Sequence, residues 1–194
     1  MTSIVVPFRG TNGKSRLPAE LRGPLALAML GDVLAACTAA GETTLVTDDP
    51  AAAALADELG ARVAEDPGGG QGAAVAAELA GLEGATLVVN ADLPCVAVDD
   101  LRIFAAPAEG GALALVEAAD GTTNALALPA TAAFAPLYGP GSAGRYREHA
   151  RTRGLAVVAS SIPNLVDDVD DAADLRRIGL RAGPRTRAIL ATVR

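Results

Sequence analysis

Short apolar runs alternate with helix-like segments through the first half of the chain. Ser3–Val6 is a β-branched run with no polar face, which is typical of a strand covered on both sides, and Thr86–Val89 has a similar composition. Further strands are expected at 43–46 and 62–64, and helices are expected to begin at Pro24, Pro50 and Ala73. Strands that alternate with helices across short links predict a parallel, doubly wound α/β sheet, whose ligands bind at the carboxyl ends of the strands.

The second half of the chain has a less regular pattern. Strands are expected at 113–116 and 124–128, and the Asp120-Gly121 turn between them indicates a small antiparallel insertion. The other expected elements are a strand at 155–159 and helices near Val98 and at 142–153, 172–178 and 184–193. No internal repeat and no long linker divides the sequence, so residues 1–194 are expected to form a single domain.

Composition and charge narrow the range of functions. The chain is 51% hydrophobic but only 3% aromatic, with no Trp, which argues against base-stacking or aromatic sugar-binding surfaces. Its 23 acidic and 16 basic residues give a net charge of −7, so neither nucleic acid nor a membrane surface is expected as a partner. No signal peptide or membrane helix is evident, and the two cysteines form no zinc pattern, which predicts a cytoplasmic protein. Any phosphate ligand must then be held by a few placed cations, by backbone N–H groups or by a metal.

The loop after the first strand, Arg9–Leu17, contains two glycines, Lys14 and Arg16. Such a loop can hold a polyphosphate with backbone donors and cationic side chains. It is not a P-loop, because Gly10 lies only three residues before Gly13 and no helix begins at Ser15. The alternative is an ordinary solvated surface loop.

Acidic residues follow two apolar segments. Asp92 comes just after the buried strand 86–89, and Pro94 fixes the turn that follows it, so its carboxylate is a candidate ligand for Mg²⁺. In the acidic run 167–171, Asp168 and Asp170 alternate with apolar residues, and one of them is a candidate for a second metal carboxylate. The alternatives are helix capping for Asp92 and a solvated acidic face for the run.

Two glycine-rich segments precede expected helices. Residues 66–72 lead into the helix at Ala73. In Gly139–Arg145, glycines are followed by Ser142 at a helix N-terminus, with Arg145 one turn further on, which favours binding of a phosphate or carboxylate through N–H groups. The alternative is an ordinary N-cap serine.

Five segments in this order resemble one family. They are Gly-Thr-Asn-Gly-Lys-Ser-Arg-Leu, Asn-Ala-Asp-Leu-Pro, Asp-Gly-Thr-Thr-Asn-Ala-Leu, Gly-Pro-Gly-Ser and Val-Asp-Asp-Val-Asp-Asp-Ala-Ala-Asp-Leu. Together they are similar to the small guanylyltransferases of coenzyme F-420 biosynthesis, which use GTP and phosphoenolpyruvate or 2-phospho-L-lactate. The resemblance runs from about Ile4 to about Leu180. It implies a nucleotidyltransferase-like variant of the Rossmann fold, with a mostly parallel sheet.

The resemblance also implies a role for individual residues. Lys14, Arg16 and Asp92 are expected to be catalytic, and Asp92, Asp168 and Asp170 to hold Mg²⁺. The residues expected at the nucleotide are Arg9, Gly13, Lys14, Gln71 and Gly72. Those expected at the phospho-acid are Thr123, Gly139, Ser142 and Arg145. The chain departs from the family at Tyr146, where a His is usual, and at Gly68–Gly72, where Leu-Asn is usual.

The implied reaction is transfer of GMP from GTP to the phosphate of phosphoenolpyruvate. Phosphoenolpyruvate is favoured because the composition, rich in Ala, Gly and Arg, is typical of a high-GC bacterium and the bacterial relatives resemble that subtype. The alternatives are 2-phospho-L-lactate or 3-phosphoglycerate as acceptor, a nucleotidyltransferase acting on molybdopterin or a sugar phosphate, a glycosyltransferase, and a nucleotide-binding module without activity. The expected partners are GTP and a small phospho-acid, and the oligomeric state is left open, with a homodimer among the options.

Overall fold

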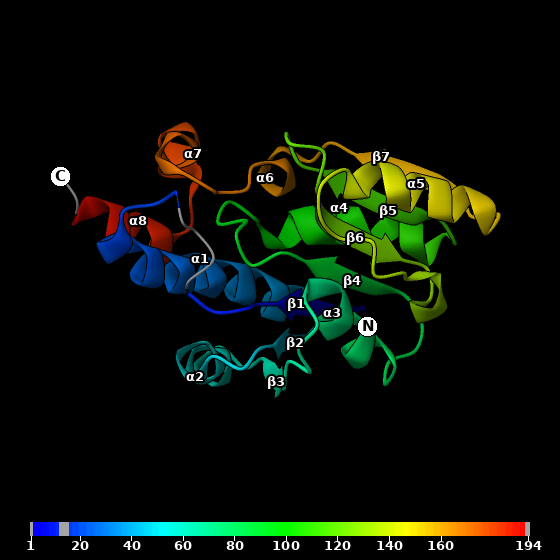
Figure 1. Ribbon diagram of the computed structural model, residues 1–194, viewed down its shortest axis with the longest axis horizontal. Helices are drawn as coiled ribbons and strands as arrows, with labels where there is room; N and C mark the ends of the chain where they lie inside the picture. The colour runs from blue at the N-terminus through cyan, green and yellow to red at the C-terminus, as the bar shows by residue number, and fades with distance from the viewer. Residues whose placement is uncertain (1, 12–15, 193–194) are drawn as a thin grey trace.

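A seven-stranded sheet forms the centre of the molecule. The computed structural model describes residues 2–11 and 16–192, and its sheet has the strand order β3-β2-β1-β4-β6-β5-β7 (Figure 1). The strands are β1 (Ser3–Pro7), β2 (Glu42–Val46), β3 (Arg62–Ala64), β4 (Thr86–Val89), β5 (Leu113–Glu117), β6 (Thr123–Leu128) and β7 (Val157–Ser160). Every pairing is parallel except those of β6, which runs antiparallel to both β4 and β5. The predicted α/β class and mostly parallel sheet are therefore confirmed.

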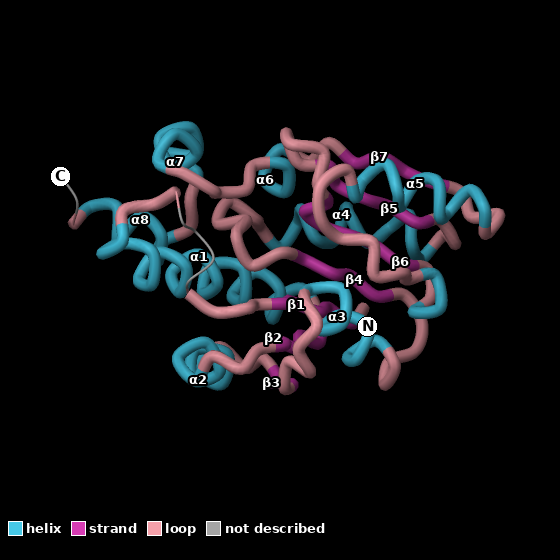
Figure 2. Tube along the Cα trace, in the orientation of Figure 1, coloured by secondary structure: helices cyan, strands magenta, loops and turns pink. Residues whose placement is uncertain are grey.

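Helices cover both faces of the sheet (Figure 2). They are α1 (Ala19–Ala40), α2 (Pro50–Glu58), α3 (Gln71–Leu79), α4 (Val98–Glu109), α5 (Ser142–Thr152), α6 (Pro163–Val166), α7 (Ala172–Ile178) and α8 (Pro184–Ala191), with short 3₁₀ turns at Thr131–Ala133 and Gly179–Arg181. Ile4 and Val6 of β1 pack with α1, α2 and α4, whereas Val5 packs with α3 and α5 on the opposite face. This alternation explains why β1 has no polar face: both of its surfaces are buried.

The structure corrects three details of the predicted elements. Pro24 does not open its helix, because α1 begins at Ala19 directly after Pro18 and Pro24 lies inside it. α3 begins at Gln71 rather than Ala73, which brings Gln71 into the first turn of that helix. The antiparallel element is not an appendage: β6 is hydrogen-bonded between β4 and β5 inside the sheet.

The reversed direction of β6 determines which residues lie at the functional edge. The carboxyl ends of the parallel strands β1 and β4 lie at one edge of the sheet. Because β6 is antiparallel, its amino end reaches that same edge, where the backbone N–H of Asn90 donates to the carbonyl of Asn124 at 3.0 Å. Thr123 and Asn124 therefore lie beside the loop that follows β4.

The C-terminal segment packs against the N-terminal half of α1. α8 lies alongside α1 in Figure 1, and a third core cluster joins Leu25 and Met29 of α1 to Leu175 and Ile178 of α7. By length and hydropathy alone α1 resembles a membrane span, but 61% of its most apolar window is buried inside the protein. Its apolar character is thus accounted for by packing in the core.

Candidate functional site

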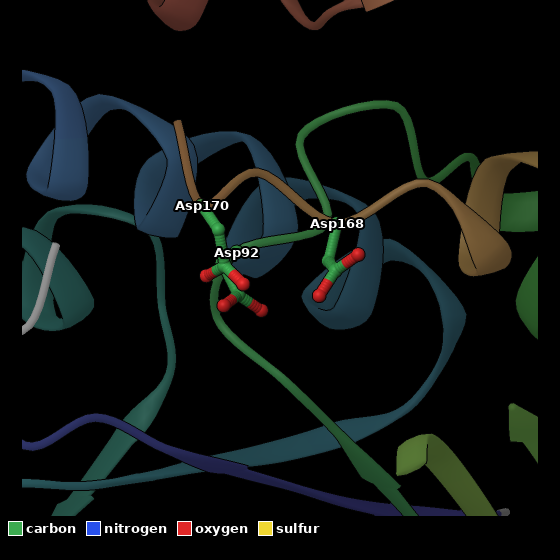
Figure 3. Close-up of side chains that lie close together, drawn as sticks. All are labelled: Asp92, Asp168 and Asp170. Carbon is green, nitrogen blue, oxygen red and sulfur yellow. The ribbon is translucent and has the colours of Figure 1, made fainter. Parts of the chain in front are cut away.

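Three carboxylates converge at the carboxyl edge of β4. Asp92 lies in the loop after β4, and Asp168 and Asp170 lie in the link between α6 and α7 (Figure 3). Each residue is half-buried, and one oxygen of each carboxylate lies within 4.8 Å of the others. At this separation and an effective dielectric constant near 20, each pair of charges repels by about 3 to 4 kcal/mol. A divalent cation offsets that repulsion, and carboxylate oxygens are the ligands of hard cations such as Mg²⁺, so the donor set fits the predicted metal.

The side chains of the acidic run 167–171 have different contacts. Asp167 accepts from the guanidinium groups of Arg177 and Arg181. Asp171 caps α7 by accepting the N–H groups of Ala173 and Asp174.

Between Asp168 and Asp170, the side chain of Val169 is completely buried in the third core cluster. The N–H of Val169 donates to the carbonyl of Asp92 at 3.2 Å. Because the polar and apolar residues alternate, burying Val169 leaves Asp168 and Asp170 together with Asp92.

A row of amide hydrogen bonds crosses the site from α3 to β6. The Nε2 of Gln71 donates to the Oδ1 of Asn90 at 2.7 Å, and the Nδ2 of Asn90 donates to the carbonyl of Thr123 at 3.2 Å. Asn90 directly follows β4 and lines the same hollows as Asp92. No role for Asn90 was predicted, although an amide immediately after a buried strand is a signal that could have identified it.

Asn124 is a second site residue that the sequence reasoning missed. It is buried in β6, and its Nδ2 donates to the carbonyls of Leu165 and Val166 at 3.1 and 3.0 Å. These bonds hold α6 against the sheet immediately before the acidic run. A polar residue in a strand that is otherwise buried was the available signal.

The hydroxyl groups of Thr123 and Ser142 lie 3.0 Å apart and are buried together. The N–H of Ser142 is not available to an anion in this structure, because it donates to the carbonyl of Gly139 at 3.0 Å, and anion binding by the other N–H groups of Gly139–Arg145 stays a prediction. Nor is Ser142 the N-cap of α5: Gly141 takes that position with a left-handed φ of +70°. Both hydroxyl-bearing residues nevertheless line the hollow that contains the acidic triad.

Arg145 braces the loop before α5. Its guanidinium donates to the carbonyls of Leu137, Tyr138, Gly139 and Pro140. These bonds fix the backbone of Gly139, which lines two hollows at the site. Direct contact between Arg145 and a substrate stays a prediction.

Two hollows meet at the triad. The first is lined by Phe8 and Arg9, which directly follow β1, and by Met29 of α1. The second is lined by the triad with Thr123 and Ser142. Gln71, Asn90 and Asp92 line both hollows. A third hollow extends from Arg9 along the glycine-rich loop to Gly72 and Tyr138. Because Gln71 lines all three hollows, they lie side by side along the edge that carries the triad.

Glycines allow close approach in this third hollow. Gly68, Gly69 and Gly70 all have positive φ values, between +78° and +99°, and Gly70 is the N-cap of α3. A Cβ on Gly72 would lie 2.7 Å from the Cβ of Pro136. Gly72 therefore lines the hollow and also permits α3 to pack against the segment that follows the 3₁₀ turn.

The cationic loop is only partly described. The predicted nucleotide-binding residues Gly13 and Lys14 lie outside the described residues, and Arg16 is exposed. Asp120, another residue that the sequence reasoning did not assign, lines the second hollow. A hydrogen bond from the Thr122 hydroxyl lowers the pKa of Asp120, with a smaller contribution from the charge of Arg16.

The fold of the chain and the sequences of its relatives together identify its class. The chain has the fold of a solved nucleotide-diphospho-sugar transferase from Desulfovibrio desulfuricans G20, with a TM-score of 0.77 and 15% identity over 98% of this chain and 94% of that one. Among curated proteins it is 37% identical to the phosphoenolpyruvate guanylyltransferase of Streptomyces scabiei, covering 97% of this chain and 95% of the relative. A second relative of the same name, from Geodermatophilus obscurus, is also 37% identical over 97% of this chain and 93% of its own length. Residues 2–192 match the family described as guanylyl transferase CofC like, and the chain belongs to that family.

Proposed function

We propose that this guanylyltransferase moves GMP from GTP to the phosphate of phosphoenolpyruvate, as a step in coenzyme F-420 biosynthesis. The products are enolpyruvyl-diphosphoguanosine and pyrophosphate. The observation that carries the proposal is the convergence of Asp92, Asp168 and Asp170 where two hollows meet. The names of the curated relatives support phosphoenolpyruvate as acceptor over 2-phospho-L-lactate.

The reaction mainly requires that the acceptor phosphate and the α-phosphorus of GTP be positioned next to each other. The acceptor phosphate is already an anionic nucleophile, so its oxygen can attack the α-phosphorus of GTP without a general base, and the bond to pyrophosphate breaks on the opposite side. Bound at Asp92, Asp168 and Asp170, Mg²⁺ would supply neutralisation of the phosphate charge.

The chain itself brings the two ligands together. We assign the first and third hollows, which Arg9, Gln71 and Gly72 help to line, to the nucleotide. Thr123 and Ser142 line the hollow assigned to the phospho-acid. Lys14 and Arg16 would offset the remaining phosphate charge, which matters in a chain of net charge −7. We propose in addition that residues 1–194 act as one domain in the cytoplasm.

Release of pyrophosphate tests the proposal. GTP and Mg²⁺ are incubated in parallel with phosphoenolpyruvate, 2-phospho-L-lactate and 3-phosphoglycerate, with ATP as the nucleotide control. Release is expected with GTP and phosphoenolpyruvate, and release only with 2-phospho-L-lactate would reassign the acceptor. GTP binding without release against any acid would support a binding module and overturn the proposed activity.

Replacing a carboxylate of the triad tests the site. Asp92→Asn is expected to lower kcat by on the order of 10²-fold, because it removes a carboxylate that would hold the Mg²⁺ neutralising the phosphate charge. Asp99→Asn is the matched control, since Asp99 is exposed in the first turn of α4 and pairs only with Arg102 among the described contacts. Equal turnover by the two variants would contradict the assignment.

A further inference from the structure

The two metal-ligand candidates of the acidic run lie in a segment with no secondary structure of its own. Residues 167–170 connect α6 to α7 and belong to neither helix. The main chain of this stretch is linked to the loop after β4 by a hydrogen bond from the N–H of Val169 to the carbonyl of Asp92. The positions of Asp168 and Asp170 therefore depend on what fixes the backbone on either side of Val169.

α7 supplies those contacts. The Oδ2 of Asp174 accepts the N–H of Asp170 at 2.9 Å and the N–H of Asp171 at 3.1 Å. The guanidinium of Arg177 donates to the carbonyl of Asp168 at 3.2 Å and to the Oδ1 of Asp174 at 2.8 Å. A single Arg–Asp pair thus holds the main chain at both ligand candidates.

Arg177 also offsets the negative charge of the acidic run, together with Arg181. Arg177 also donates to the carboxylate of Asp167, which Arg181 shares. Five carboxylates lie in the segment or directly after it, at Asp167, Asp168, Asp170, Asp171 and Asp174. Repulsion among these charges and from Asp92 disfavours the position of the segment beside Asp92. The two guanidinium groups offset part of that repulsion on the side of the segment that faces α7.

We propose that Arg177 and Asp174 are positioning residues for the cation site. They hold the backbone of residues 168–171 so that the carboxylates of Asp168 and Asp170 face Asp92. This inference rests on the proposed cation site. Neither residue is among the three cation ligands: both act through the main chain that carries two of those ligands.

The test measures binding of Mn²⁺ alone, by electron paramagnetic resonance of the free ion, to wild-type protein and to variants. Arg177→Ala is expected to weaken Mn²⁺ binding by about 10-fold or more, as is usual when a partner that orients a metal ligand is removed. The matched control is Arg151→Ala, because Arg151 also pairs with an acid three residues earlier, Glu148, on the exposed surface of α5. Its Mn²⁺ affinity is expected to equal that of the wild type.

The outcomes separate this inference from the proposed site. If wild-type protein binds Mn²⁺ and Asp92→Asn does not, but Arg177→Ala binds as tightly as Arg151→Ala, the positioning role is wrong and the site stands. If the wild type binds no Mn²⁺, the proposed site fails and the inference fails with it. A purely structural role would lower the melting temperature of Arg177→Ala without changing the Mn²⁺ affinity of the folded protein.

A second variant covers the case in which Arg177→Ala does not fold. Asp174→Asn keeps one oxygen acceptor but loses the charge that pairs with Arg177 and one of the two oxygens in use. Its Mn²⁺ affinity is expected to fall in the same direction. An unchanged affinity for Asp174→Asn would overturn the inference.

Discussion

At the scale of single residues, Asn124 connects the sheet to the acidic run. Its amide donates to two carbonyls at the end of α6, and a carboxylate in its place would face those carbonyls without a donor. Asn124→Asp is expected to lower the free energy of unfolding by about 1 to 3 kcal/mol. It should also reduce pyrophosphate release, because α6 leads directly into the acidic run that contains Asp168. Thermal unfolding and the release assay measure the two effects.

The matched control for that prediction is Asn164→Asp. Asn164 lies in α6 itself, and its amide donates to the side chain of Asp100 in α4 rather than to the main chain before the acidic run. If both variants retain wild-type pyrophosphate release, Asn124 does not position the acidic run.

At this scale the sequence indicated the charged residues of the candidate site. Apolar runs precede Asp92, Asp168 and Asp170. The alternation of Asp168 and Asp170 with the buried Val169 indicated that these two carboxylates lie on the same side of the chain. It missed Asn90 and Asn124, because an amide has no charge and its task depends on partners far away in the sequence. The contact between Ser142 and Thr123 was hidden for the same reason, since it joins α5 to β6.

At the scale of elements, the junction of α1 with α8 is packed without spare space. Asp32 of α1 accepts the N–H groups of Arg185 and Thr186 in the first turn of α8. A Cβ on Gly183 would lie 2.3 Å from the Cγ of Asp32. Gly183→Ala is therefore expected to lower the free energy of unfolding by about 1 to 3 kcal/mol through overpacking, as measured by denaturant unfolding.

Gly144→Ala is the control, since a Cβ at Gly144 in α5 meets nothing within 4 Å. That variant should be neutral or slightly more stable, because Ala favours a helix over Gly. Similar destabilisation of both variants would show that the close approach of Asp32 is not the cause.

Element order was predictable because burial dictates it. β3, β4 and α7 lie at the residues that the sequence indicates, since their apolar runs are bounded by glycine, proline or a capping Asp. The start of α1 and the place of β6 inside the sheet were not predictable in the same way. Each depends on packing against elements distant in the sequence, which local patterns do not record.

At the scale of the whole molecule, buried and half-buried ionisable groups of both core faces contribute to the response to alkaline pH. Burial raises the pKa of Cys37 to about 12, and burial also raises the pKa values of Tyr138 and Tyr146. In the unfolded chain a thiol ionises at about pH 8.5 and a phenol at about pH 10. The folded state therefore keeps these groups neutral above the pH at which the unfolded chain ionises them.

The sign of the pH dependence follows from that difference. The unfolded chain loses protons first, so the stability linked to these groups is fully present below about pH 8.5 and is lost as the pH rises toward about 12. Denaturant unfolding at pH 7.5, 9 and 10.5 should show a steady fall. Because Cys37 lies in α1 against β1, far from the triad, Cys37→Ala should make that fall shallower without changing pyrophosphate release at neutral pH. An unchanged slope would mean that the thiol is ionised equally in both states, which its complete burial argues against.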